Sequence, residues 1–202
     1  MILVYVDDLL VLVQCEQQRK KIEAELGRVF TLKSLGIIKT YIGMHIEHTR
    51  KGYILIQNSK ITQMLKECNL EQCKTVETPM VANFLGEESC DSEPFEDVEL
   101  YQSIIGKLLY LSQWSRPDIL TAVNILSRFS SKPTKRHWVG VKRILRYLKG
   151  TIDKGMYLEP DEDLKLDACV DSDWAGDIHD RKSTSGYIVL LGGCLVGWKT
   201  RK

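Results

Sequence analysis

Residues 1–13 read Met-Ile-Leu-Val-Tyr-Val-Asp-Asp-Leu-Leu-Val-Leu-Val, two apolar runs on either side of an Asp pair. Short runs of β-prone residues around a tight polar step are typical of two antiparallel strands and their turn. The stretch therefore predicts a β-hairpin that carries Asp7 and Asp8 at its tip. It is too short and too charged to span a membrane, and it lacks a secretory cleavage pattern.

The Asp pair has two interpretations. Each carboxylate would cost several kcal/mol if it were buried without a partner. Mg²⁺ would offset that cost because it binds a few carboxylates together with substrate phosphates, as in two-metal phosphoryl transfer. The alternative is a pair of solvent-exposed Asp residues in an ordinary turn, and a bare Asp-Asp without further context favours that alternative.

Hydrophobic periodicity predicts the remaining elements. Helices are expected at residues 16–30, 59–68 (with Ser59 as N-cap), 100–114, 117–129 and 135–148. Strands are expected at residues 41–47, 53–57, 164–170, 186–191 and 194–198, with Gly192-Gly193 as a hairpin turn. The second helix should bury Ile61, Met64 and Leu65.

The charges are unevenly distributed along the chain. The total, 28 Lys and Arg against 27 Asp and Glu, points to no particular class of partner. Residues 71–99 are mostly acidic, whereas residues 101–155 are mostly basic and include Arg116 and several residues of the last predicted helix. This basic block is a candidate phosphate-binding surface, and its alternative interpretation is a solvated helix face.

The six cysteines contain no Cys-x-x-Cys pair, and the four histidines have no zinc-site spacing. This usage predicts reduced thiols in an intracellular protein of the cytoplasm or nucleus.

The sequence resembles copia-type retrotransposon Pol polyproteins over nearly its whole length. Tyr5-Val6-Asp7-Asp8 resembles the palm motif of reverse transcriptases. Further matches follow in the family's order, at residues 30–36, 41–43, 78–80, 105–111, 116–119, 137–138, 145–151, 171–177 and 181–187. Ser34 stands where the family pattern has Asp. Each motif is weak alone, but their shared order argues against chance agreement.

The resemblance implies roles for individual residues. Asp7 and Asp8 would be two of three polymerase carboxylates that bind Mg²⁺ or Mn²⁺, and Asp171 the first metal-binding Asp of an RNase H fold. The residues expected to contact the template–primer duplex or the incoming dNTP are Tyr5, Val6, Ile42, Gly43, Met44, Lys142, Arg143, Arg146 and Lys149. The hairpin at residues 41–57 is similar to a primer grip, with a purely structural hairpin as its alternative.

The implied fold class is α+β with four parts. Residues 1–80 would form part of a reverse transcriptase palm, 81–99 an acidic linker, 100–155 a basic helical thumb or connection, and 156–202 the first strands of a truncated RNase H-like domain. A family polymerase also needs a third palm carboxylate, the fingers and later RNase H carboxylates, which lie outside this sequence. We therefore expect no polymerisation by this chain alone.

Two readings of function follow. The first is a segment of an RNA-directed DNA polymerase that acts within a longer Pol polyprotein. The alternative is a non-enzymatic transposon remnant that binds nucleic acid through its basic helices. A host-adopted regulatory protein is a third, weaker possibility.

Overall fold

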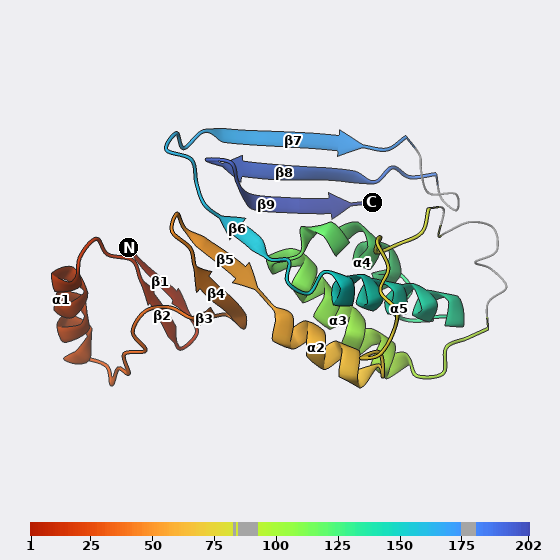
Figure 1. Cartoon of the computed structure of the whole chain (residues 1–202), viewed down its shortest axis with the longest axis horizontal. Coiled ribbons are helices and arrows are strands. Elements are labelled where there is room, and N and C mark those ends of the chain that lie inside the picture. The colour runs from red at the N-terminus through yellow and green to blue at the C-terminus, as the bar shows by residue number, and fades with distance from the viewer. Residues whose placement is uncertain (83, 85–92, 175–180) are drawn as a thin grey trace. The chain divides into compact units, whose positions relative to one another are not determined.

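The computed structural model describes residues 1–82, 84, 93–174 and 181–202, which include nine strands and five α-helices (Figure 1). In chain order these elements are β1 (Ile2–Tyr5), β2 (Asp8–Val11), α1 (Glu16–Gly27), β3 (Thr40–Tyr41), β4 (Met44–His48), β5 (Tyr53–Ile56), α2 (Asn58–Glu67), α3 (Val98–Trp114), the 3₁₀ turn η2 (Pro117–Ile119), α4 (Leu120–Ser127), α5 (Lys135–Gly150), β6 (Met156–Leu158), β7 (Leu166–Ser172), β8 (Ser185–Leu191) and β9 (Cys194–Arg201). The chain divides into two compact units, Met1–Ile38 and Lys39–Lys202.

The first unit contains the predicted hairpin, β1–β2, followed by α1. The two strands pair antiparallel from Ile2 with Val11 to Tyr5 with Asp8. Along α1, Arg19 pairs with Glu16 and Glu23, one turn away on either side, as such helical spacings allow. The helix ends at Gly27, earlier than the sequence pattern predicted.

The second unit begins with a four-stranded antiparallel sheet in the order β3-β4-β5-β6. The single strand predicted over residues 41–47 is wrong, because a two-residue turn at Ile42 and Gly43 separates β3 from β4. Both turn residues have positive φ, at 47° and 69°, a conformation that reverses a strand in two residues. Strand β6, which the sequence pattern did not predict, pairs with β5.

Helices α2 to α5 form the hydrophobic core of the second unit. Their inward-facing positions repeat every three or four residues, and the predicted Ile61, Met64 and Leu65 are buried as expected. The predicted cap at Ser59 is wrong, since α2 begins at Asn58 with Gln57 at the N-cap. The predicted helix at residues 117–129 begins as η2 and continues as α4.

A three-stranded antiparallel sheet, β7-β8-β9, completes the second unit. Gly192 and Gly193 form the predicted hairpin turn, with φ values of 53° and 74°. The sheet is tied to the helices through β9: Trp198 Nε1 donates to the Ser112 carbonyl at 2.7 Å. The Asn124 amide likewise donates to Thr200 Oγ1 at 2.6 Å.

The predicted α+β class is confirmed. Much of the expected acidic linker, at residues 83 and 85–92, lies outside the described residues. Within the described part of the chain, no helix has both the length and the apolarity needed to cross a membrane.

Candidate nucleic-acid and metal sites

The tip of the β1–β2 hairpin consists of Val6 and Asp7, and Asp8 is the first residue of β2, opposite Tyr5. Val6 has φ 51°, a left-handed conformation that a β-branched residue rarely adopts. Such a residue costs on the order of 1–3 kcal/mol, and strain of this kind gathers at functional sites. A two-residue hairpin turn places its first turn residue at positive φ, so the tip has ordinary hairpin geometry with an unusual residue, Val6, at that position.

Both carboxylates of the hairpin are exposed. Two neighbouring carboxylates are hard oxygen donors of the kind that Mg²⁺ accepts while it keeps water and phosphate as its other ligands. Among the residues that the structure describes, no group of three His, Cys, Asp or Glu residues gathers around a common point. Asp7 and Asp8 thus fit part of a divalent-metal site and would need ligands from outside the described residues.

The turn between β3 and β4 is held from a distant helix. Tyr110 of α3 donates its hydroxyl hydrogen bond to the Ile42 carbonyl. A side-chain Cβ at Gly43 would lie 3.2 Å from Lys60 Cε and 3.3 Å from the Tyr110 hydroxyl, so glycine permits this close approach. Met44, the third residue predicted here, is 4% exposed, which leaves Ile42 and Gly43 as the accessible part of the turn.

Beside this turn, α2 and α3 line a groove of about 380 Å³. We call it the α2–α3 groove, and its lining residues are Lys60, Gln63, Ser103, Gly106, Lys107 and Tyr110. The Lys60 ammonium lies 5.5 Å from the centre of the Tyr110 ring, and Lys107 pairs with Glu67. A Cβ at Gly106 would meet no atom within 4 Å, so the groove is open there. The groove thus combines cationic, hydroxyl and aromatic groups around an open floor.

The basic side of α5 faces an extended segment, residues 73–82, which we call the strap. Three basic side chains of α5 each donate one hydrogen bond to it: Arg143 to Thr78 Oγ1 at 2.8 Å, Arg146 to the Lys74 carbonyl at 2.7 Å, and Lys149 to the Cys73 carbonyl at 2.8 Å. Lys142 makes no hydrogen bond or ion pair with the residues that the structure describes. Three of the four basic residues predicted to contact nucleic acid on α5 therefore already have partners in the fold.

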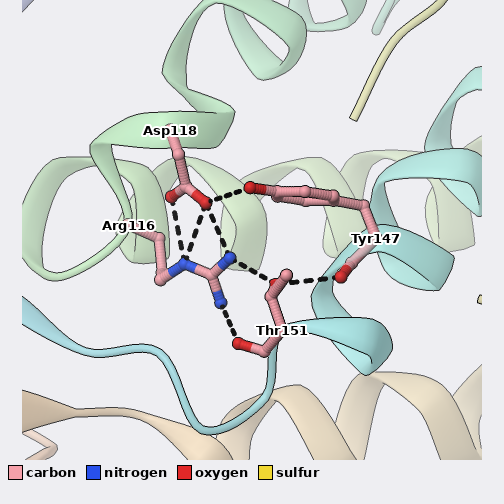
Figure 2. A network of polar contacts seen from close by, with 4 residues as sticks. All are labelled: Arg116, Asp118, Tyr147 and Thr151. Carbon is pink, nitrogen blue, oxygen red and sulfur yellow. Dashed lines mark hydrogen bonds and ion pairs between the residues drawn. The ribbon is translucent and has the colours of Figure 1, made fainter. Parts of the chain in front are cut away.

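Arg116, another residue of the basic block, is buried, and its guanidinium points toward Asp118 and Thr151 (Figure 2). Its side chain is 3% exposed and forms a two-pronged ion pair with Asp118, while it also donates to the carbonyl and hydroxyl of Thr151. The Tyr147 hydroxyl donates to the same carboxylate at 2.8 Å. Burial on its own would raise the pKa of Asp118, but the bonds from Arg116 and Tyr147 outweigh it and lower that pKa. The interpretation of Arg116 as part of a phosphate-binding surface is wrong.

Comparison with known proteins identifies the family. The family model described as reverse transcriptase (RNA-dependent DNA polymerase) matches residues 1–82. The chain is 37% identical over 201 residues to the retrovirus-related Pol polyprotein from transposon RE2 of Arabidopsis thaliana, and 34% identical over 207 residues to that from transposon TNT 1-94 of Nicotiana tabacum. It is also 33% identical to an uncharacterized mitochondrial protein of Arabidopsis thaliana, of which it covers 82%. The chain belongs to the copia-type retrotransposon Pol family.

The predicted resemblance and the reverse transcriptase reading are thereby confirmed at the level of the family. The matches to these three relatives each cover 99% or more of this chain, but the chain spans only 14% of the RE2 polyprotein and 16% of the TNT 1-94 polyprotein. No solved structure matches the chain.

The Asp171 site of this retrotransposon Pol segment lies in β7, one residue before the strand ends. Asp171 is exposed and pairs with Gly186 of β8. Asp173 accepts a hydrogen bond from the Thr184 backbone at 2.7 Å, and Asp177 lies outside the described residues. The metal-binding role of Asp171 stays a prediction.

Sequence reasoning missed most of the α2–α3 groove. Lys60 was not recognised as a site residue, nor were Ser103 and Tyr110. A signal was present, because Ser103, Lys107 and Tyr110 recur at helical spacing on the side of α3 opposite its buried stripe. A polar face with a glycine at its centre is compatible with a close-fitting ligand.

Proposed function

We propose that the chain supplies part of the template–primer binding surface and the metal-binding Asp pair of a retrotransposon reverse transcriptase, acting within a longer Pol polyprotein. The observation that carries this proposal is the α2–α3 groove, which lies directly beside the strained turn at Ile42 and Gly43. In this proposal residues 1–80 belong to the palm, 100–155 to the thumb or connection and 156–202 to an RNase H-like domain, with residues 81–99 as linker.

The groove suits a nucleic-acid backbone. Lys60 offers cationic charge to phosphates, whereas Lys107 already pairs with Glu67. The exposed Gly106 lets a sugar–phosphate backbone approach the helix closely. Contacts of this kind position a duplex without reading its sequence. They match what a polymerase requires, since it must hold any template–primer pair.

The turn at Ile42 and Gly43 would brace the primer end next to the groove. Tyr110 belongs to both features, because it lines the groove and holds the Ile42 carbonyl. Tyr110 would thereby fix the position of the turn relative to the duplex in the groove. Met44 would act only through its backbone, since its side chain is buried.

Asp7 and Asp8 would bind a divalent metal, with Tyr5 and Val6 near the primer terminus and the incoming dNTP. A bound Mg²⁺ or Mn²⁺ would supply activation of the 3′-hydroxyl and neutralisation of the phosphates. The strain at Val6 would serve to fix the direction of the two carboxylates. In the RNase H-like part, Asp171 would have the corresponding metal-binding role. Selective broadening of the hairpin amide signals by Mn²⁺, lost in Asp7→Asn, tests the Asp pair.

The groove is tested by measuring RNA–DNA duplex binding at two or more salt concentrations. Lys60→Ala should weaken binding and reduce the slope of log K against log salt by about one. Lys142→Ala is the matched control, because it removes a charge from α5 outside the groove. A loss of slope in Lys142→Ala with no change in Lys60→Ala would place the duplex on α5 and contradict the proposal.

A second variant separates binding from folding. Gly106→Leu fills the open floor of the groove, and leucine is a better helix former than glycine by roughly 0.8 kcal/mol. We expect this variant to unfold at the same or a higher temperature while its duplex affinity falls about tenfold or more. Unchanged affinity in Gly106→Leu would show that the duplex does not enter the groove.

A further inference from the structure

Thr78 stands out in the strap because it is followed by proline. The chain has five prolines, and only Pro79 follows a serine or threonine. Thr78 is exposed and lies in a stretch without helix or strand, where the following proline favours extended backbone. An exposed hydroxyl in an extended Thr-Pro segment is the substrate shape that proline-directed serine/threonine kinases accept.

The surroundings of Thr78 contain basic side chains and hydrogen-bond donors that can bind an anion. Arg143 Nη2 donates to Thr78 Oγ1 at 2.8 Å. The Nε–H of the same guanidinium is buried and has no acceptor among the residues that the structure describes. Lys142, next to it on α5, makes no ion pair with those residues. A donor without a partner therefore lies beside an exposed hydroxyl, in a basic setting.

We propose that Thr78 is a phosphorylation site for a proline-directed kinase, and that Arg143 binds the resulting phosphothreonine. The Thr78 oxygen attacks the γ-phosphorus of ATP, so that the Oγ–P bond forms while the bond to the β-phosphate oxygen breaks. ADP leaves with that electron pair, and the hydroxyl proton passes to a base of the kinase. The strap then carries the phosphoryl group beside the guanidinium.

Phosphorylation would tighten the strap on α5. A phosphothreonine brings a charge of about −1.5 to −2 and three strong acceptor oxygens. These oxygens can accept from the unpartnered Nε–H as well as from Nη2, in the two-pronged geometry that guanidinium groups favour. The strap would thereby change from a segment held by neutral acceptors to one held by an ion pair.

The first arm of the test measures modification. The purified chain is incubated with a proline-directed kinase and ATP, and the product is mapped by mass spectrometry, with a synthetic peptide of residues 72–84 as positive control. We expect one phosphoryl group per chain, located on Thr78, absent in Thr78→Ala and strongly reduced in Pro79→Ala. Phosphorylation of the peptide without phosphorylation of the chain would overturn the proposal, since the strap would then be closed to the kinase.

The second arm measures the phosphate's partner. In a chain of this size one added charge-assisted hydrogen bond, about twice as strong as a neutral one, raises Tm by about 4–8 °C. We expect phosphorylation to raise Tm by that amount in the wild-type chain and to give no rise in Arg143→Gln. Thr78→Ser, which keeps the hydroxyl, should be phosphorylated and show the same rise. An equal change of Tm in wild type and Arg143→Gln would overturn the assignment of Arg143.

Discussion

Helix α3 and strand β7 have similar apolar residues and opposite burial. In α3, Ile104 and Leu108 are completely buried against the other helices. In β7, Leu166 is 68% exposed and Val170 is 79% exposed, on one face of a sheet that no described element covers. Because burial rather than composition yields stability, the helices should provide most of the free energy of folding. The two regions therefore differ in packing: the apolar side of α3 is buried by described residues, whereas the apolar face of β7 is exposed to solvent.

The sharpest test of this contrast is the same substitution in both regions. Leu108→Ala should lower the free energy of unfolding by about 3 kcal/mol, since it removes a fully buried side chain and leaves a cavity. Leu166→Ala should change it by less than about 0.5 kcal/mol, because that side chain already faces solvent. Urea denaturation of both variants gives the comparison. Equal losses in the two would mean that β7 is as well packed as α3.

Much of this helical core could be predicted from the sequence. The helical spacing of apolar residues predicts one apolar side for α2, at Ile61, Met64 and Leu65, and one for α5. Both sides are buried in the structure. Helix ends were less predictable, because Ser59 has the chemistry of a cap while the chain begins its helix earlier, at Asn58. The strand break at Ile42 escaped prediction for a physical reason. Isoleucine avoids positive φ, and the Tyr110 bond that holds it there comes from 68 residues away.

The role of the basic residues could not be predicted from charge alone. A helix face that binds phosphates and one that binds backbone carbonyl groups of the same protein are both rich in Arg and Lys, so their sequences look alike. The acceptors of Arg146 and Lys149 are backbone carbonyls, which every residue has and which leave no mark in a sequence. Burial of Arg116 had a weak signal, since Asp118 lies two residues away and can pair with it. For Asp7 and Asp8 the structure adds their exposure and the positive φ of Val6, and their metal-binding role stays a prediction.

The ion pair between Arg116 and Asp118 gives the next largest predicted effect on stability. Arg116→Met should destabilise the chain by about 2–3 kcal/mol, because it removes the cationic partner of the partly buried Asp118 carboxylate (Figure 2). We place the loss below the range for fully buried pairs because Asp118 is one-third exposed. The control, Lys135→Met, removes an exposed pair with Glu93 and should leave the urea midpoint unchanged. A midpoint that moves equally in both variants would contradict a special role for the buried pair.

A buried histidine makes the helical region sensitive to pH. Burial, reinforced by the charge of Arg136, lowers the pKa of His137 to about 4. In the unfolded chain the ordinary pKa is about 6.5, so the unfolded state binds the proton first as pH falls. Stability should therefore decrease from about pH 6.5 down to about pH 4, by roughly 2 kcal/mol between pH 7 and pH 5.

His137→Gln separates this effect from other titrations. The His137 ring accepts a hydrogen bond from the Thr134 backbone at 3.0 Å in a capping box, and glutamine is a usual residue at that position. The variant keeps the cap but cannot titrate, so its unfolding free energy should lose most of the slope between pH 5 and pH 7. A variant with the wild-type slope would assign the pH dependence to other groups.

The smallest predicted effect lies at the border between the core and the strap. Arg146→Met removes one hydrogen bond to the Lys74 carbonyl and should cost about 1 kcal/mol. A change of that size alters the closed-to-open ratio of the strap roughly fivefold, so trypsin should cleave after Lys74 about five times faster. Lys142→Met, which breaks no bond within the described residues, should leave the cleavage rate unchanged. Faster cleavage in both variants would mean that the net charge of α5, rather than hydrogen bonds to particular carbonyl groups, holds the strap. The basic side chains of α5 would then not be committed to those carbonyls, and the interpretation of this face as a nucleic-acid contact would be strengthened.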